Sequence, residues 1–523
     1  MTQTRRDVII GATSMGLGLA IAPRVALSAA EHPFSLGVAS GEPWPDSVVL
    51  WTRLTRDLHA PDGGMGAAPV EVTWEVARDE HMKDIVRSGV TLAMPDVAHS
   101  VHIEVMGLEP ARWYWYRFRA DGVQSPIGRT RTAPAQGTAL PNLTFVAACC
   151  QHWMYGNWAA YRRMLEEKID FVLHLGDYIY ESPSSSPAAV KQVVRDVPFD
   201  VPKTLADYRR VHGFYKTDPA IQAVHAAFPW IMTWDDHEVE NDYTGVSNER
   251  RLAPFERLQQ RAAAYQAYWE HMPLRLAQRP LGPNAIMYRR FAFGDLMDLV
   301  MLDERQFRSA LPCPPAPPAR DRSRRMAIDD CKDAFDPARS MLGVDQEQWL
   351  AKVLAEPARA RWSVLGQQML FAPHLTKNKE QKLAIRTDGW DGYAVAHQRI
   401  LDLIAARPNR DSLVIGGDIH AFIASDVPAK RDDLASPAIA AHVVIGPVSS
   451  RLGDHASLEA SRPENPHIKF ADGRRHGYTR CTLTRDRATF EFRAVNDVTD
   501  ANSAIGTLAS FETEWGKAGL RQV

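Results

Sequence analysis

The strongest constraint in this sequence is a set of apolar segments that end abruptly in turns carrying acidic side chains. The run Phe171-Val172-Leu173 is typical of a buried strand, and Gly176 breaks it immediately before Asp177. A strand over 143–148 and a helix over Tyr155–Lys168 would complete a strand–helix–strand unit with parallel strands. In an open α/β sheet, ligands bind beyond the carboxyl ends of the strands, so Asp177 is expected where chemistry takes place.

Three other strands are expected to end in turns of the same kind. They lead into Cys149-Cys150-Gln151, Trp234-Asp235-Asp236-His237-Glu238 and Gly417-Asp418-Ile419-His420. With Tyr180, three residues after Asp177, these turns offer thiolate, carboxylate, imidazole and phenolate donors, which are metal ligands. A helix cap explains any single turn equally well, but four turns at one sheet edge favour a metal site.

Length and charge exclude several classes of protein. The chain has 523 residues, more than one compact domain usually holds. Its formal net charge of -2 gives no field that would attract nucleic acid, and no nucleic-acid-binding module is expected. After residue 30, no apolar segment is long enough to form a stable membrane span. We therefore expect a multidomain globular protein, and a monomer.

The N-terminus resembles a targeting segment. Arg5-Arg6 precedes the apolar stretch Val8–Ala22, and small residues follow that would permit cleavage after Ser28 or Ala30. Residues 1–30 are therefore predicted to be a twin-arginine signal peptide, with the twin-arginine export machinery as partner and the periplasm or cell exterior as destination. The alternative, a membrane anchor, is disfavoured because several glycines and a proline make this a poor spanning helix.

The rest of the chain divides into three predicted parts. Residues 31–136 contain short alternating strands and are predicted to form an all-β domain like an immunoglobulin or fibronectin sandwich. Residues 140–500 are predicted to form an α/β domain, and 501–523 a C-terminal segment. Residues 182–215 are expected to be mostly loop.

A proline-rich and charged insertion over 311–340 contains Cys313 and Cys331. An oxidising compartment would allow these two cysteines to pair, but free thiols are nearly as well supported by the sequence.

The acidic turns resemble motifs of a known family. Gly176-Asp177-x-x-Tyr180, Asp236-His237-Glu238 and Gly417-Asp418-x-His420 resemble calcineurin-like metallophosphoesterases, and the whole chain is similar to the alkaline phosphatase D (PhoD-like) family. The closer resemblance rests on further segments in the family's order: Phe34–Gly41, Val49–Arg53, Ala148–Gln151, His174–Glu181, Trp234–Val239, Leu302–Arg308 and Asp388–Tyr393. It implies a two-sheet metallophosphoesterase sandwich flanked by helices.

The resemblance also implies a metal centre of Fe³⁺ and Ca²⁺. Cys150 and Tyr180 would bind ferric iron, together with His420, and Asp177 would bridge the iron and the calcium ion. Asp418 would bind calcium. Asp236 stands where the wider superfamily has an Asn ligand, and Asn241 is a nearby substitute, so both stay candidates. Cys149 competes with Cys150, which is favoured because it directly precedes Gln151.

Catalytic roles follow from the same resemblance. His237 would lie beside the substrate phosphate and stabilise or protonate the leaving oxygen. Arg305 is the first candidate for a phosphate clamp because a guanidinium matches phosphate in a bidentate manner. Arg308 is a second candidate that could instead hold Asp303. A metal-bound hydroxide would attack phosphorus without a serine or threonine nucleophile.

The expected function is that of a secreted metal-dependent phosphatase acting on phosphomonoesters and phosphodiesters. A phospholipase-type phosphodiesterase is an alternative within the same chemistry. A non-catalytic binding protein on a phosphatase scaffold is a second alternative, but no metal ligand is visibly lost. A calcium-dependent carbohydrate or lipid binder is disfavoured because residues 31–136 contain no acidic cluster.

Overall fold

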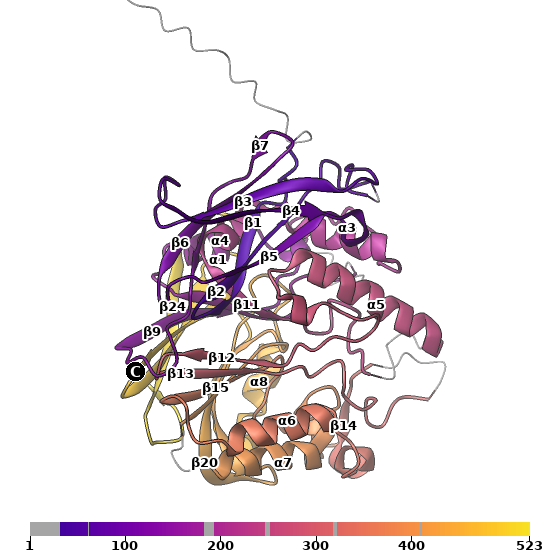
Figure 1. Ribbon diagram of the computed structural model, residues 1–523. Coiled ribbons are helices and arrows are strands. Elements are labelled where there is room, and N and C mark those ends of the chain that lie inside the picture. Colours follow the sequence, from indigo (N-terminus) through magenta and orange to yellow (C-terminus); the bar gives the residue numbers. More distant parts are fainter. Residues whose placement is uncertain (1–31, 61, 183–192, 246–251, 317–321, 408–410) are drawn as a thin grey trace, which may run out of the picture.

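Figure 1 shows the structure, a computed structural model that describes residues 32–60, 62–182, 193–245, 252–316, 322–407 and 411–523. The signal peptide predicted over residues 1–30 lies outside the described residues. Among the described helices, none is both long and apolar enough to cross a membrane.

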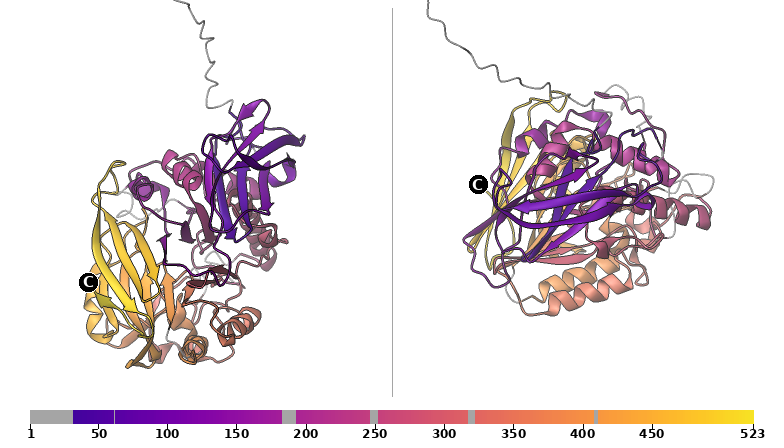
Figure 2. Two further views of the ribbon diagram at one scale, coloured as in Figure 1. Left: turned by 60° about the vertical axis from the view of Figure 1, so that its left-hand side comes forward. Right: turned by 45° about the horizontal axis from the view of Figure 1, so that its top comes forward.

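A ten-stranded mixed sheet runs through the molecule, and its three central strands are parallel. Its order is β25-β24-β23-β22-β9-β10-β11-β1-β2-β5. The central strands are β9 (Asn142–Ala148), β10 (Phe171–Leu175) and β11 (Pro229–Thr233). The flanking strands are β22 (Gly477–Thr484), β23 (Arg487–Val495), β24 (Ile505–Glu514), β25 (Arg521–Gln522), β1 (Val38–Trp44), β2 (Ser47–Arg53) and β5 (Ser100–Met106). Strands from the two ends of the chain thus form opposite sides of one sheet (Figure 2).

A seven-stranded sheet packs against the first, in the order β12-β13-β15-β18-β20-β19-β21. Its strands are β12 (Arg289–Phe293), β13 (Met297–Met301), β15 (Trp362–Gly366), β18 (Ser412–Gly416), β19 (Phe422–Lys430), β20 (Asp433–Val444) and β21 (Ile468–Asp472). Strands β13, β15, β18 and β20 are parallel, so their carboxyl ends lie at one edge of the sheet.

The central strands of both sheets are buried on both faces, which explains their continuous apolar runs. Along β10, Phe171 and Leu173 pack with residues of the second sheet, whereas Val172 belongs to the core beneath the helices. This alternation follows from the two-residue period of a strand. The molecule is therefore layered as helices, sheet, sheet and helices (Figure 1).

The helices cover the outer faces. On the ten-stranded sheet lie α1 (Ala159–Met164), α3 (Leu205–Tyr215), α4 (Pro219–Ala227) and α5 (Pro254–His271). The second sheet is covered by α6 (Val344–Ala355) and α7 (Ala394–Ala405), and the short α8 (His455–Ala460) contacts β21. The α/β class predicted from the sequence is confirmed, and two sheets lie face to face.

The N-terminal region is all-β, as predicted, but it shares a sheet with the rest of the chain. Strand β1 pairs in parallel with β11, so β1, β2 and β5 extend the ten-stranded sheet. The other strands, β3 (Val70–Ala77), β4 (Ile85–Ala93), β6 (Trp113–Ala120), β7 (Val123–Gln124) and β8 (Gly128–Arg131), form a separate sheet that packs on this extension. Strands β1 and β24 lie outside the predicted α/β part over 140–500, but both belong to its ten-stranded sheet. The predicted boundaries therefore divide one continuous sheet.

Two predictions of secondary structure, one of a loop and one of a helix, need correction. The expectation of loop is wrong over α3, which begins after the cap Thr204 and has a reciprocal hydrogen bond between Thr204 and Asp207. The helix expected over Tyr155–Lys168 is shorter, because Trp158 adopts a left-handed backbone conformation and α1 begins after it.

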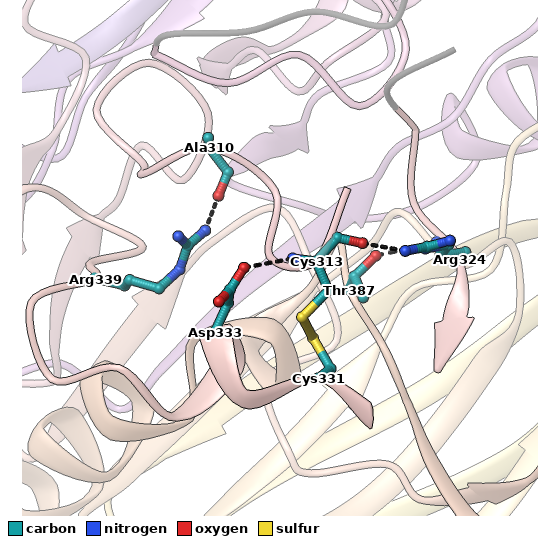
Figure 3. Close-up of a disulfide and its surroundings, with 7 residues drawn as sticks. All are labelled: Ala310, Cys313, Arg324, Cys331, Asp333, Arg339 and Thr387. Atoms are coloured by element: carbon teal, nitrogen blue, oxygen red, sulfur yellow. Dashed lines mark hydrogen bonds between the residues drawn. A yellow bond between two sulfur atoms is a disulfide. The ribbon is translucent and has the colours of Figure 1, made fainter. Parts of the chain in front are cut away.

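A disulfide closes a loop within the insertion over 311–340. Cys313 and Cys331 are joined, and the Cys313 amide donates to Asp333 while Arg324 donates to the Cys313 carbonyl (Figure 3). Strand β14 (Arg325–Ala327) pairs with β17 (Leu383–Arg386), which pairs with β16 (Thr376–Lys377). The alternative of two free thiols is therefore not what the structure contains.

Replacing both cysteines, in Cys313→Ser/Cys331→Ser, is expected to lower the free energy of unfolding by about 3 kcal/mol, because the disulfide closes a loop with a sequence separation of 18 residues. Urea unfolding of the oxidised protein and of the double variant measures this difference. Adding a reductant should destabilise the wild type and leave the variant unchanged. Equal stability of the oxidised wild type and the variant would contradict the expectation.

Candidate metal centre

The carboxyl ends of strands from both sheets meet around one cavity of about 240 Å³. β10 and β11 of the large sheet lead into it, and so does β18 of the second sheet. Six of the predicted site residues line this cavity: Asp177, Asp236, His237, Asn241, Asp418 and His420. Cys150 and Tyr180 are buried directly behind its wall.

The first group of ligands surrounds Asp177. The Tyr180 hydroxyl donates to Asp177 Oδ2 at 2.8 Å and lies 3.1 Å from His420 Nε2. Ligand atoms of Cys150, Asp177 and His420 lie within 4.8 Å of one another. Cys149 instead points its sulfur at the Ile445 carbonyl, 3.8 Å away. The structure therefore brings Cys150, and not Cys149, to this group.

A second group consists of carboxylates on the other side of Asp177. Asp236 shares one potential cation site with Asp177 and His237, another with Asp235 and Asp418, and a third with Asp242 and Asp388. In each set the ligand atoms lie within 4.8 Å of one another. Asn241 lines the same cavity, and its backbone amide donates to Glu181 at 3.2 Å. Both alternative ligands, Asp236 and Asn241, thus line the same cavity.

The backbone is strained at these positions. Cys150, Asp177, Asp418 and His420 all have φ between 55° and 66°. Non-glycine residues adopt this left-handed conformation at a cost, and they persist where the surrounding structure and function require it. Gly176, with φ of 103°, lets the chain pass so close to Asp235 that a side chain there would collide with it. Four predicted ligands therefore share the same uncommon backbone conformation.

Glu238 ties two of the loops together. Its carboxylate is fully buried and accepts hydrogen bonds from the backbone amides of Asp177, Tyr178 and Asp235, at 3.2, 2.6 and 2.8 Å. Sequence reasoning identified Glu238 as part of a motif and assigned it no role. Its contacts make it a positioning residue for the turn that carries Asp177.

His237 is oriented toward the cavity by an acidic partner. Its Nδ1 lies 2.6 Å from Glu181, and its ring packs on Tyr180 with ring centres 4.1 Å apart. Burial alone would lower the pKa of His237, but Glu181, Asp177 and Asp236 raise it well above its ordinary value. The imidazole can therefore present a proton at Nε2 near neutral pH.

Arg305 does not lie where a phosphate clamp should be. It is fully buried beneath the carboxylates and pairs with Asp235, with Asp388 at 3.0 Å and with Asp418 at 2.9 Å. The prediction of Arg305 as a clamp is therefore corrected, because its guanidinium nitrogens are already bound to carboxylates. Arg308 is also buried and pairs with Asp388 at 2.9 Å, not with Asp303.

The electrostatics of the centre favour bound cations. Burial raises the pKa of Asp236 to about 7, and Arg305 only partly offsets this effect. One oxygen of Asp177, Oδ1, is buried without a hydrogen-bond partner among the described residues. A buried carboxylate oxygen without a partner is costly, and a metal ion would satisfy it. The thiol, phenol, imidazole and carboxylate groups around it are donors that metal ions bind.

Sequence reasoning missed several residues of the cavity. Asp242 and Asp388 belong to the carboxylate group around Asp236, and Arg325 and Arg386 line the wall formed by β14 and β17. Asp388 lay inside a segment singled out for its family resemblance, which could have drawn attention to it. The two arginines carried no such signal.

Comparison with known proteins agrees with this architecture. The profile of the family described as PhoD-like phosphatase matches residues 145–492, and that of the PhoD-like phosphatase N-terminal domain matches residues 19–134. The chain is 40% identical to alkaline phosphatase D of Bacillus subtilis (strain 168) over 535 aligned positions, which cover 100% of this chain and 89% of that protein. A solved structure described as "Structure of PhoD" matches with a TM-score of 0.88 at 40% identity, over 94% of this chain and 92% of the other.

Proposed function

This chain belongs to the PhoD-like phosphatase family and is a phosphoric ester hydrolase, and from that premise we propose that it hydrolyses phosphomonoesters and phosphodiesters at a centre of Fe³⁺ and Ca²⁺. The observation that carries the proposal is the cluster of Cys150, Asp177 and His420, whose ligand atoms lie within 4.8 Å of one another and which includes a buried carboxylate oxygen without a partner among the described residues.

The iron side would consist of Cys150, Tyr180, His420 and Asp177. Thiolate, phenolate and imidazole donors suit iron better than calcium. Burial and neighbouring anions raise the pKa of Cys150 and of Tyr180 well above their ordinary values. Without a cation, both groups would therefore stay protonated, so their anionic forms depend on the ion that they bind.

The calcium side would consist of oxygen donors from Asp177, Asp236 and Asp418, with Asn241 beside them. Calcium takes six to eight oxygen ligands, and the carboxylate-rich half of the cavity supplies several. Asp177 stands between both halves and would bridge them.

The chemistry that two such ions supply is a hydroxide nucleophile at neutral pH and neutralisation of charge on the phosphate oxygens. The chain's own residues complete the reaction. His237 faces the cavity with Glu181 on its Nδ1, so it can donate a proton from Nε2 to the leaving oxygen. Glu238 keeps Asp177 in place through three backbone amides. Arg305 stabilises the carboxylates from below.

Finer features of the fold and of location are part of the same proposal. The two face-to-face sheets flanked by helices support the proposal of a metallophosphoesterase sandwich, and the packing of β3, β4 and β6 on β1, β2 and β5 supports that of an immunoglobulin-like sandwich. The sequence Arg5-Arg6 supports twin-arginine export to the periplasm or exterior. The disulfide between Cys313 and Cys331 is consistent with an oxidising compartment.

Metal analysis combined with a visible spectrum tests the centre. The active protein is expected to contain iron and to show a tyrosinate-to-iron charge-transfer band. Tyr180→Phe should abolish that band, because it removes the Tyr180 hydroxyl, which contacts Asp177 and His420.

Tyr155→Phe is the matched control, since Tyr155 is buried nearby and its hydroxyl has no hydrogen-bond partner among the described residues. The band should persist in this variant. An iron-free protein with full phosphatase activity would contradict the iron assignment. A panel of monoesters, nucleotide diesters and phospholipid diesters, assayed with the same preparation, separates general phosphodiesterase activity from the phospholipase-type alternative.

A further inference from the structure

The cavity of the predicted metal ligands is also lined by a pair of arginines. In the antiparallel pair β14–β17, Arg325 lies directly opposite Arg386. Both line the cavity that contains Asp177, Asp418 and His420, and both are exposed to solvent. Directly opposed like charges on adjacent strands destabilise a sheet. The pair therefore has an electrostatic cost that an anion between the two guanidinium groups would remove.

The rest of the small sheet explains why both arginines point to the same side. Met326 and Ile385, the next register pair, face the other way into an apolar cluster with Cys331 and Ala334. Side chains alternate between the faces of a strand, so burying this pair directs Arg325 and Arg386 toward the cavity. The two cysteines of the disulfide shown in Figure 3 belong to the same apolar cluster.

Neither arginine has an ion pair or a side-chain hydrogen bond within the described part of the chain. Loss of hydration alone would lower the pKa of the Arg386 guanidinium, but the nearby carboxylates of Asp418, Asp242 and Asp388 raise it above its ordinary value. The pKa of His374 is lowered to about 4, first by burial and then by the positive charges of neighbours that include Arg325 and Arg386. The two arginines therefore act on the same part of the cavity. This differs from Arg305 and Arg308, whose guanidinium groups are already paired with carboxylates.

Apolar side chains line part of the cavity that the arginines share with the metal ligands. Leu370, Ile419 and Leu458 line the cavity together with Met369 and Trp390. A phosphate ester bound at the metal ligands could therefore extend its organic group across this surface and reach Arg325 and Arg386. A guanidinium pair is well suited to a phosphate because it offers several donors in a planar arrangement.

We propose that Arg325 and Arg386 form a subsite for a second phosphate group of the substrate, and that the enzyme therefore favours phosphate esters that carry another phosphate beyond the scissile one. This inference rests on the proposed function, since it requires hydrolysis at the neighbouring metal centre. Arg325 and Arg386 act in this subsite as specificity-determining residues.

The test compares two substrates of the metal-loaded, full-length enzyme. One is a p-nitrophenyl phosphodiester of a nucleoside, and the other is the same diester with an additional phosphate on its sugar. We expect kcat/KM of the wild type to be about tenfold or more higher for the second substrate, because hydrogen bonds to charged groups are among the stronger polar contacts. In Arg325→Gln/Arg386→Gln this preference should fall to about one.

Two further variants control for charge and for folding. Arg325→Lys/Arg386→Lys keeps both charges and should retain part of the preference. Arg324→Gln removes the neighbouring arginine, which does not line the cavity and should leave the preference as in the wild type. Thermal unfolding of each variant checks that the sheet is intact.

A wild type without preference, or a preference that survives in the double glutamine variant, would overturn the subsite while leaving the proposed function standing. If the metal-loaded wild type hydrolysed neither substrate, the proposed function would fail, and the subsite with it.

Discussion

Asp177→Asn is expected to lower kcat/KM for phosphate esters by about a thousandfold or more. Asp177 belongs to the group with Cys150 and His420 and also to the group with Asp236 and His237, so its carboxylate is common to both halves of the centre. An amide keeps the shape of the side chain but loses the negative charge that would hold two cations. Metal ions contribute several kcal/mol of transition-state stabilisation, which corresponds to about three orders of magnitude in rate.

Activity measurements and metal analysis of the same purified variant test this expectation. The matched control is Asp170→Asn, because Asp170 precedes the opposite end of β10 and pairs with Arg131. The control should keep its metal content and its activity within about threefold, as expected for a substitution away from the site. A thousandfold loss in Asp177→Asn with unchanged metal content would place the defect in substrate binding instead. Retained activity would show that the centre lies elsewhere.

The residues of this centre that sequence reasoning found are those at the ends of strands. Asp177, Asp236, Asp418 and His420 each follow an apolar run, and ligands collect beyond the carboxyl ends of such strands. A local pattern thus predicted a long-range arrangement. The expectation of a single sheet edge is wrong, because Asp177 and Asp236 follow strands of the ten-stranded sheet whereas Asp418 and His420 follow β18 of the second sheet. Arg305 has the same local pattern, yet it is buried among carboxylates, because its surroundings depend on Asp235, Asp388 and Asp418 from three other segments.

The parts of the fold that escaped prediction depend on pairing between distant segments. β1 was recognised as part of a β region, but its parallel partner β11 lies almost two hundred residues further on, at Ser40 and Pro229. No local periodicity encodes such a partner. In contrast, α3 was missed although its cap at Thr204 and the acidic residue at Asp207 form a recognisable capping box. The pairing of β1 with β11 therefore cannot be predicted from local sequence, whereas the start of α3 can.

Arg305→Gln is expected to destabilise the metal-free protein by about 3–5 kcal/mol, the cost of leaving buried charges without their partner. Arg305 is fully buried and contacts Asp235, Asp388 and Asp418, with Asp236 at 3.5 Å. A neutral amide of similar reach cannot balance these carboxylates. The variant should therefore be less stable than the wild type but have a similar KM for substrate. Loss of a phosphate clamp would instead raise the KM.

The loss of stability should depend on pH in a defined direction. Burial raises the pKa of Asp236 to about 7 even with Arg305 present, and its folded-state pKa is thus above the unfolded value. A raised carboxylate pKa means that ionisation costs stability as the pH rises through the folded value. Without Arg305 the pKa of Asp236 would rise further. The difference between variant and wild type should therefore be larger at pH 8 than at pH 5, where Asp236 is protonated in both proteins.

Urea unfolding of chelator-treated protein at both pH values measures this effect. Arg325→Gln is the matched control, because Arg325 is exposed on β14 and has no ion pair in the described part of the chain; its substitution should change stability by less than about 0.5 kcal/mol. Restoring the metal ions should recover part of the stability lost in Arg305→Gln, since cations among the same carboxylates would replace some of the missing charge. A variant as stable as the wild type but with a raised KM would contradict this assignment, and would return Arg305 to the role of a phosphate clamp.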